Sequence, residues 1–128
     1  MNGRARREKG ARGEREFAAE LSKHLGVTCH RELGAARDGG QDLCVEGWAI
    51  EVKRQEILQL PVWWAQACSQ ALERNLLPAL AYRMSRHPWR VIVPLDVIQC
   101  GYWRWRKESL EWAAQLSIAG FAAVVRES

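Results

Sequence analysis

Apolar residues repeat along the chain with two periods, and each period predicts a different kind of element. Helical spacing over residues 13–25 and again over residues 58–75 predicts two helices. Gly26 suits the C-terminus of the first helix, and Pro61 suits the first turn of the second. The buried positions expected on these helices are Phe17, Ala18, Leu21 and Leu25 in the first and Trp64, Ala65, Cys68, Ala71 and Leu72 in the second.

Shorter apolar runs predict the strands. They span residues 27–32, two arms of a hairpin within 41–56, and 78–84 and 89–95, which the turn SRHP joins. Towards the C-terminus, residues 108–116 predict a short helix, and residues 121–125 predict a strand or a docked segment. A strand, a helix and a further strand in succession favour parallel pairing through a right-handed crossover. Together with the antiparallel hairpin, this order predicts a mixed sheet flanked by helices, of class α/β (α+β).

The hairpin sequence QDLCVEGWAIEVKRQE allows its register to be worked out. If Glu46-Gly47 is a two-residue turn, Val45 pairs with Trp48 and Asp42 pairs with Glu51, although Glu-Gly is not a preferred pair for such a turn. Side chains alternate between the two faces of a strand. One face then carries Leu43, Val45, Trp48, Ile50 and Val52, and the other carries Asp42, Cys44, Ala49, Glu51 and Lys53. The register that gives the best apolar layer therefore also places two carboxylates side by side.

Two opposed carboxylates repel each other, so this arrangement needs a compensating cation. Lys53, two residues after Glu51, can supply one as a surface ion pair of little consequence for stability. A divalent metal such as Mg²⁺ would compensate more fully, since it prefers carboxylate oxygens and shares substrate phosphate. Such a site can hydrolyse phosphodiesters, with Lys53 orienting the attacking water and neutralising the developing charge. On these residues, both interpretations stand, and the metal site is the favoured one.

Glu14 lies on the same helical face as Phe17, three residues before it. A favourable interaction with the helix dipole in the first turn is the simple explanation. A second explanation is that Glu14 points at a metal or a substrate and holds the metal directly or through water. Glu16 and Glu20 are expected among the solvent-facing positions.

Composition and charge narrow the class of protein. A chain of 128 residues with 48% hydrophobic and 27% charged residues fits a single globular domain. No apolar run is long enough for a membrane span and no secretory signal is present, so we expect a cytoplasmic protein without a membrane partner. No nucleotide-binding glycine signature is present, and we expect no small-molecule organic cofactor. Four cysteines, Cys29, Cys44, Cys68 and Cys100, are scattered along the sequence. Their spacing is not typical of a zinc site or a disulfide framework.

The net charge of +4 is unevenly placed. Residues 1–12 alone sum to +4, which predicts a basic flexible arm ahead of a single domain spanning residues 13–128. A second basic stretch covers residues 83–107. Clustered Lys and Arg attract nucleic-acid phosphates, although a solubilising tail and a solvated loop would have the same composition.

Three segments resemble the PD-(D/E)XK nuclease superfamily: GERE at 13–16, Asp42 before an apolar strand, and IEVKRQE at 50–56. Within it the chain is similar to the small archaeal and phage-type Holliday junction resolvases, over about residues 9–95. The resemblance implies a restriction-endonuclease-like core and DNA cleavage that depends on Mg²⁺ or Mn²⁺. It also implies a cytoplasmic protein of a bacterial or phage-infected host cell, and a possible homodimer.

The resemblance also implies roles for individual residues. Asp42 and Glu51 would be metal ligands, Lys53 the catalytic lysine, and Glu14 the auxiliary acid of the first helix. The backbone carbonyl of Val52 would be a further metal ligand. Gln55 could contact a phosphate or a water, and Gln66 matches a glutamine found near the site in some relatives. For both glutamines an exposed polar side chain is the simpler explanation.

The segment YWRWRK alternates Trp103 and Trp105 with Arg104 and Arg106. Interleaved aromatic and basic residues suit unpaired bases of distorted DNA. The same residue types are enriched at protein interfaces. Because members of the family that the chain resembles are commonly dimers, a dimer contact is the favoured interpretation.

These observations predict a metal-dependent endodeoxyribonuclease acting on branched or structured DNA in recombination, repair or phage replication. The alternatives are a non-catalytic nucleic-acid-binding module on the same fold, and a structural or partner-binding protein that uses the Trp-rich C-terminal half. The residues expected to bind DNA are Arg4, Arg6, Arg7, Lys9, Arg12, Arg37, Gln66, Arg83, Arg86 and Arg90.

Overall fold

A mixed sheet organises the fold. The computed structural model describes residues 3–27, 29–31, 42–104, 106 and 108–128. Within this part of the chain six strands pair in sequence order, and the β3–β4 pair is parallel while the other pairs are antiparallel. The strands are β1 (His30–Arg31), β2 (Asp42–Val45), β3 (Trp48–Arg54), β4 (Leu77–Arg83), β5 (Arg90–Pro94) and β6 (Ala113–Leu116). The predicted mixed sheet with flanking helices is confirmed.

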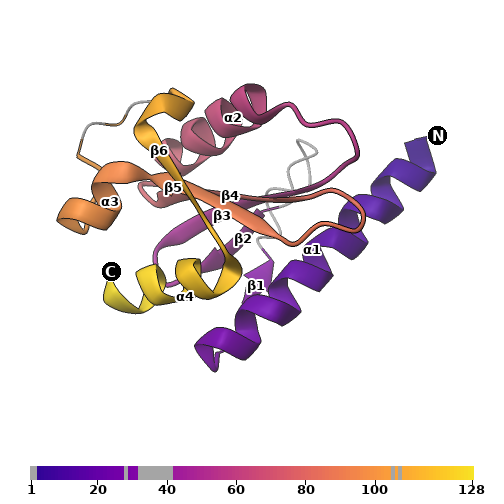
Figure 1. Ribbon diagram of the computed structural model, residues 1–128, viewed down its shortest axis with the longest axis horizontal. Coiled ribbons are helices and arrows are strands. Elements are labelled where there is room, and N and C mark those ends of the chain that lie inside the picture. Colours follow the sequence, from indigo (N-terminus) through magenta and orange to yellow (C-terminus); the bar gives the residue numbers. More distant parts are fainter. Residues whose placement is uncertain (1–2, 28, 32–41, 105, 107) are drawn as a thin grey trace.

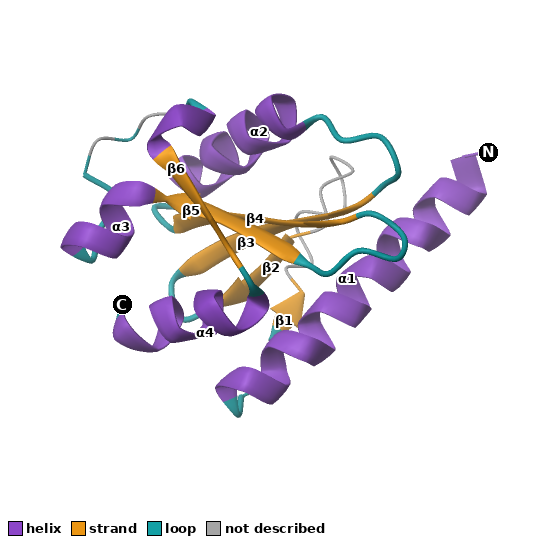
Figure 2. Cartoon of the chain, viewed as in Figure 1, coloured by secondary structure: helices purple, strands orange, loops and turns teal. Residues whose placement is uncertain are grey.

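Helices cover both faces of the sheet (Figure 1). α2 lies on one face, and α1 and α4 lie on the other, as the secondary-structure colouring in Figure 2 also shows. Two aromatic contacts tie the second layer to the sheet, because Trp48 meets Phe121 and Trp89 meets Phe17, each with ring centroids 5.1 Å apart. The helices are α1 (Gly3–Leu25), α2 (Leu60–Glu73), α3 (Leu95–Cys100), the 3-10 turn η2 (Leu110–Trp112) and α4 (Ile118–Glu127).

The β2–β3 hairpin has the predicted register. Val45 is the partner of Trp48, and Asp42 is the partner of Glu51. Glu46 and Gly47 both have positive φ, 47° and 87°, as a type I′ turn requires. The predicted apolar face, Leu43, Val45, Trp48, Ile50 and Val52, is buried throughout.

Glu46 occupies a turn position that asparagine fills better. We expect Glu46→Asn to raise the free energy of unfolding by about 0.5–1 kcal/mol, since asparagine tolerates positive φ and Asn-Gly is the favoured type I′ pair. Urea denaturation measures the change. Glu46→Ala keeps the unfavourable φ and should bring no gain, and an equal gain from both variants would contradict this explanation.

The N-terminal prediction was wrong in extent. The helix expected from residue 13 begins at Gly3, so residues 3–12, expected as a flexible arm, lie within α1. Gly10 and Gly13 lie within this helix, and the Arg, Ala, Lys and Glu residues around them favour helix. The basic residues of this segment are therefore arranged on a helix.

The C-terminal predictions were wrong in part. Residues 113–116, expected in a helix, form β6 and pair with β5. Residues 121–125, expected as a strand or docked segment, lie in α4, which Ser117 caps by accepting a hydrogen bond from the Gly120 N–H at 3.0 Å. α3 was not predicted.

On α2 the buried stripe is rotated relative to the prediction. Ala65 is half-buried and Leu72 is exposed, whereas Trp63 and Ala67 are buried. Cys68 is fully buried, and burial, followed by the charge of Glu108, raises the pKa of its thiol to about 12. Cys68 therefore behaves as a core residue, as expected of a free cysteine.

Candidate active site

The two central acids meet across the β2–β3 pair. Asp42 and Glu51 are directly opposed Cα partners, a position that brings Cβ atoms within roughly 5.5 Å of each other. The structure describes Asp42 by its backbone, and its side chain lies outside the described part. Glu51 is 2% exposed and belongs to a strand with neighbours on both sides. The hairpin thus fixes Asp42 beside a buried carboxylate.

Lys53 provides the charge that a buried Glu51 requires. Its Nζ atom lies 3.4 Å from Glu51 Oε1, and its side chain is 18% exposed while that of Glu51 is 2% exposed. A buried carboxylate without a cation would be costly, so this pair stabilises the charged form of Glu51. The partial exposure of Lys53 leaves an approach for a substrate from solvent.

α1 brings Glu14 towards the same strand. Gly13 packs so closely on β3 that a Cβ atom at this position would lie 2.8 Å from Arg54 Cβ. Glu14 follows directly and is buried, with 4% of its surface exposed. The prediction that Glu14 lies on the buried face of the helix is confirmed, and its role at a metal stays a prediction.

The remaining site candidates differ in their surroundings. Val52, which lies between Glu51 and Lys53 in the sequence, is buried. Gln55 is exposed, and its N–H donates to the Arg83 carbonyl at 3.2 Å, which continues the β3–β4 contact past the end of β3. Gln66 is exposed on α2. Their predicted roles remain untested.

Within the described side chains no three His, Cys, Asp or Glu residues converge on one metal position. The expected ligand set includes Asp42, whose side chain is not among them. Asp42 and Glu51, whose Cα positions are opposed, and Glu14 on the adjoining helix are nevertheless all acidic residues, and carboxylate oxygens are hard ligands. The residues present thus fit Mg²⁺ or Mn²⁺ by chemistry.

The candidate DNA-binding residues differ in their surroundings. Arg4 and Arg12 are exposed on α1, and Arg86 and Arg90 are exposed at or near the β4–β5 turn. For Arg6 and Arg7 only the helical backbone is described, and Arg37 lies outside the described residues.

Arg83 is engaged within the protein. It forms an ion pair with Glu16, and its Nε donates to the His87 carbonyl at 2.8 Å. The Trp89 indole N–H also donates to Glu16, at 3.0 Å. Glu16, expected at a solvent-facing position, therefore binds the ends of β4 and β5 to α1.

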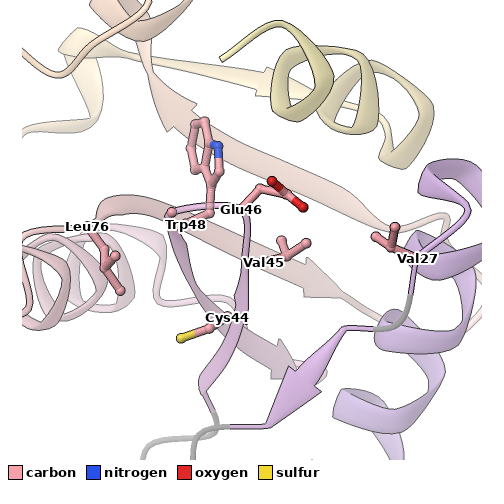
Figure 3. Close-up of a pocket in the computed structure, with 7 residues that line it drawn as sticks. Val27, Cys44, Val45, Glu46, Trp48 and Leu76 are labelled. Atoms are coloured by element: carbon pink, nitrogen blue, oxygen red, sulfur yellow. The ribbon is translucent and has the colours of Figure 1, made fainter.

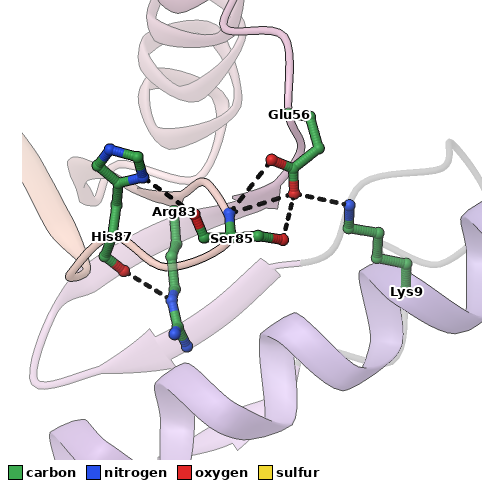
Figure 4. Close-up of polar contacts among 5 residues, drawn as sticks. All are labelled: Lys9, Glu56, Arg83, Ser85 and His87. Carbon is green, nitrogen blue, oxygen red and sulfur yellow. Dashed lines mark hydrogen bonds and ion pairs between the residues drawn. The ribbon is translucent and has the colours of Figure 1, made fainter.

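A second polar cluster, centred on Glu56, was not predicted from the sequence. Glu56 accepts hydrogen bonds from the Ser85 N–H at 3.1 Å and from the Ser85 hydroxyl, and Lys9 Nζ lies 3.2 Å from the same oxygen (Figure 4). These hydrogen bonds from Ser85, followed by Lys9, lower the pKa of Glu56. Local sequence shows only that an acidic residue closely follows Lys53. Ser85 and Lys9, which bind this residue, are far from it in the sequence.

An open pocket of about 450 Å³ lies at the turn of the β2–β3 hairpin (Figure 3). It is lined by Val27, Cys44, Val45, Glu46, Gly47, Trp48 and Leu76. Cys44 Sγ accepts a hydrogen bond from Arg74 at 2.8 Å here. The pocket lies at the end of the hairpin away from Asp42 and Lys53, so it is not the candidate active site.

Among the described helices, none combines the length and the hydrophobicity that a transmembrane span requires.

Comparison with known proteins gives the class. A family model described as "Phage putative PDDEXK endonuclease" matches residues 5–104, a span that includes most of α1, the hairpin and the β4–β5 turn. The chain belongs to this family of PD-(D/E)XK endonucleases, whose members generally use divalent metals. The predicted superfamily is confirmed.

The chain is similar to the solved structure of Hjc, a Holliday junction resolvase from Archaeoglobus fulgidus. The two are 27% identical with a TM-score of 0.48, over 65% of this chain and 70% of the other. The search of curated proteins gives no match.

Proposed function

We propose that this protein is a metal-dependent endodeoxyribonuclease that hydrolyses phosphodiester bonds at the site formed by Asp42, Glu51 and Lys53. The observation that carries the proposal is the pairing of Asp42 with Glu51, with Lys53 Nζ 3.4 Å from Glu51 Oε1. Membership of an endonuclease family supports it.

The site residues divide the work. Asp42 and Glu51 would hold Mg²⁺ or Mn²⁺, with Glu14 and the Val52 carbonyl as further ligands. When bound, a divalent metal polarises a phosphoryl oxygen and stabilises charge on the leaving oxygen. Lys53 would orient the attacking water and neutralise negative charge that develops on the phosphate. Gln55, exposed just past the end of β3, would contact a phosphate or a water.

The substrate proposed is branched or structured DNA, as formed in recombination, repair or phage replication. The sequence resemblance to small junction resolvases supports this choice. A homodimer would suit such a substrate, since two cuts are needed to resolve a symmetric junction.

The test uses labelled duplex, flap and four-way-junction DNA incubated with the protein and Mg²⁺, Mn²⁺ or EDTA. We expect cleavage that requires a divalent metal and is fastest on the branched substrates. Binding without cleavage of any substrate in either metal would favour the non-catalytic DNA-binding module. Equal rates on all three substrates would reject the branched-DNA preference and leave the nuclease assignment in place.

A further inference from the structure

Hydrogen bonds connect the turn between β4 and β5 to the segment that follows β3, the strand that carries Glu51 and Lys53. Glu56, three residues after Lys53, accepts hydrogen bonds from the backbone and the hydroxyl of Ser85 in that turn (Figure 4). Lys9 of α1 binds the same carboxylate at 3.2 Å. Glu56 therefore joins three segments that are distant in sequence.

A second carboxylate fixes the base of the turn. Glu16 of α1 pairs with Arg83 at the end of β4 and accepts a hydrogen bond from Trp89, which directly precedes β5. α1 thus contacts the turn at both ends, at Arg83 and at Trp89. Because Arg83 is paired with Glu16, its charge is used in a contact within the protein.

Arg86 lies at a strained position of this turn. The His87 N–H donates to the Met84 carbonyl at 3.1 Å, so Arg86 is the third residue of a four-residue turn, and its φ is 66°. Glycine or asparagine is favoured at that position when φ is positive. An arginine there costs conformational energy, and such outliers cluster at functional sites. Its side chain is exposed.

The turn also lies close to the catalytic lysine. Lys53 is level with Tyr82 in the parallel β3–β4 pair, and Arg86 is four residues further along the chain. At roughly 3.3 Å per residue, Arg86 lies within about 13 Å of that level. One strand of DNA has a phosphate about every 3.4 Å of helix axis. The distance thus corresponds to a few nucleotides.

We propose that Arg86 binds a backbone phosphate of the substrate DNA a few nucleotides from the scissile bond, and that Glu56 is the positioning residue that holds the turn for this contact. The inference rests on the proposed nuclease function. A guanidinium group binds phosphate oxygens through two parallel hydrogen bonds, which a held turn presents in a fixed direction.

Binding of labelled four-way-junction and duplex DNA, measured by fluorescence anisotropy in EDTA, tests the contact without cleavage. Arg86→Gln should weaken binding about tenfold and reduce the slope of log K against log [salt] by about 1. Arg126→Gln is the matched control, because Arg126 binds the His24 carbonyl, about 22 Å along α1 from Lys9. It should bind DNA as the wild type does.

Two further variants distinguish loss of the phosphate contact from misfolding and from a change in the overall charge of the protein. Arg86→Gly removes the strained φ, so it should melt no lower than the wild type and still lose the affinity. Glu56→Ala removes a negative charge, which by long-range electrostatics alone would strengthen DNA binding. Positioning by Glu56 predicts weaker binding instead, and predicts no further weakening when Arg86 is already glutamine.

Each of the other possible outcomes would reject one part of the proposal. Wild-type affinity in Arg86→Gln, or an equal loss in Arg126→Gln, would overturn the phosphate contact while the nuclease assignment stands. Tighter binding by Glu56→Ala would overturn the positioning role. Failure of the wild type to bind or cleave any DNA would overturn the proposed function and this contact with it.

Discussion

Lys53→Met is expected to lower the rate of DNA cleavage by about 10²–10⁴-fold, measured under single-turnover conditions with saturating Mg²⁺. Methionine keeps much of the side-chain length and volume but removes the cation that lies 3.4 Å from Glu51 Oε1. The variant would lose the group that orients water and neutralises the phosphate. Asp42 and Glu51 remain, so metal binding measured by calorimetry should persist.

The control for this variant is Lys23→Met. Lys23 is exposed in the last turn of α1, and its loss removes the same charge without touching the hairpin. We expect wild-type cleavage from Lys23→Met. Similar losses in the two variants would mean that overall charge, and not the position of Lys53, controls the rate.

Gly13→Ala is expected to destabilise the protein and to slow cleavage, although alanine is the better helix former. The added Cβ would lie 2.8 Å from Arg54 Cβ, an atom that no side-chain rotation can move away. Overpacking of this kind costs about 1–3 kcal/mol, more than the roughly 0.5–1 kcal/mol that replacing a helical glycine gains. Because α1 must shift, Glu14, the proposed auxiliary metal ligand, would be displaced with it, and the rate should fall by up to about 100-fold.

Gly10→Ala provides the matched variant on the same helix. A Cβ atom at Gly10 meets nothing within 4 Å in the described structure. Urea denaturation should therefore show a gain of about 0.5–1 kcal/mol for Gly10→Ala and a loss for Gly13→Ala. A gain in both variants, with unchanged cleavage, would show that the close approach of α1 to β3 does not position Glu14.

The hairpin could be predicted because its pattern permits one satisfactory register. A shift of one strand by a single residue would place Leu43 on the opposite face from Ile50 and Val52, so the apolar alternation determines which residues are paired. The same alternation placed Asp42 opposite Glu51. The core of the candidate site was therefore available from local sequence.

The C-terminal elements could not be predicted in the same way. Ala113–Leu116 contains residues that favour helix, yet it forms β6 because β5 offers an edge to pair with. Tertiary pairing overrides weak local preference in so short a segment. The helical spacing of Ile118, Phe121 and Val125, in contrast, is visible in the sequence and is typical of a helix such as α4.

The contacts around the β4–β5 turn depend on long-range folding. Glu16 meets Arg83 and Trp89 across 67 and 73 residues of chain, and Glu56 meets Lys9 across 47. Local periodicity carries no information about such partners. Gly13 is a similar case, since its need for a small residue arises from Arg54 on another element.

The most direct test of the central claim is cleavage of labelled four-way-junction DNA in Mg²⁺ by the wild type and by Asp42→Ala. Asp42 is placed opposite Glu51 by the hairpin register, so its removal should abolish cleavage while the protein still folds and binds DNA. Cleavage by Asp42→Ala at the wild-type rate would show that the paired acids are not the catalytic site.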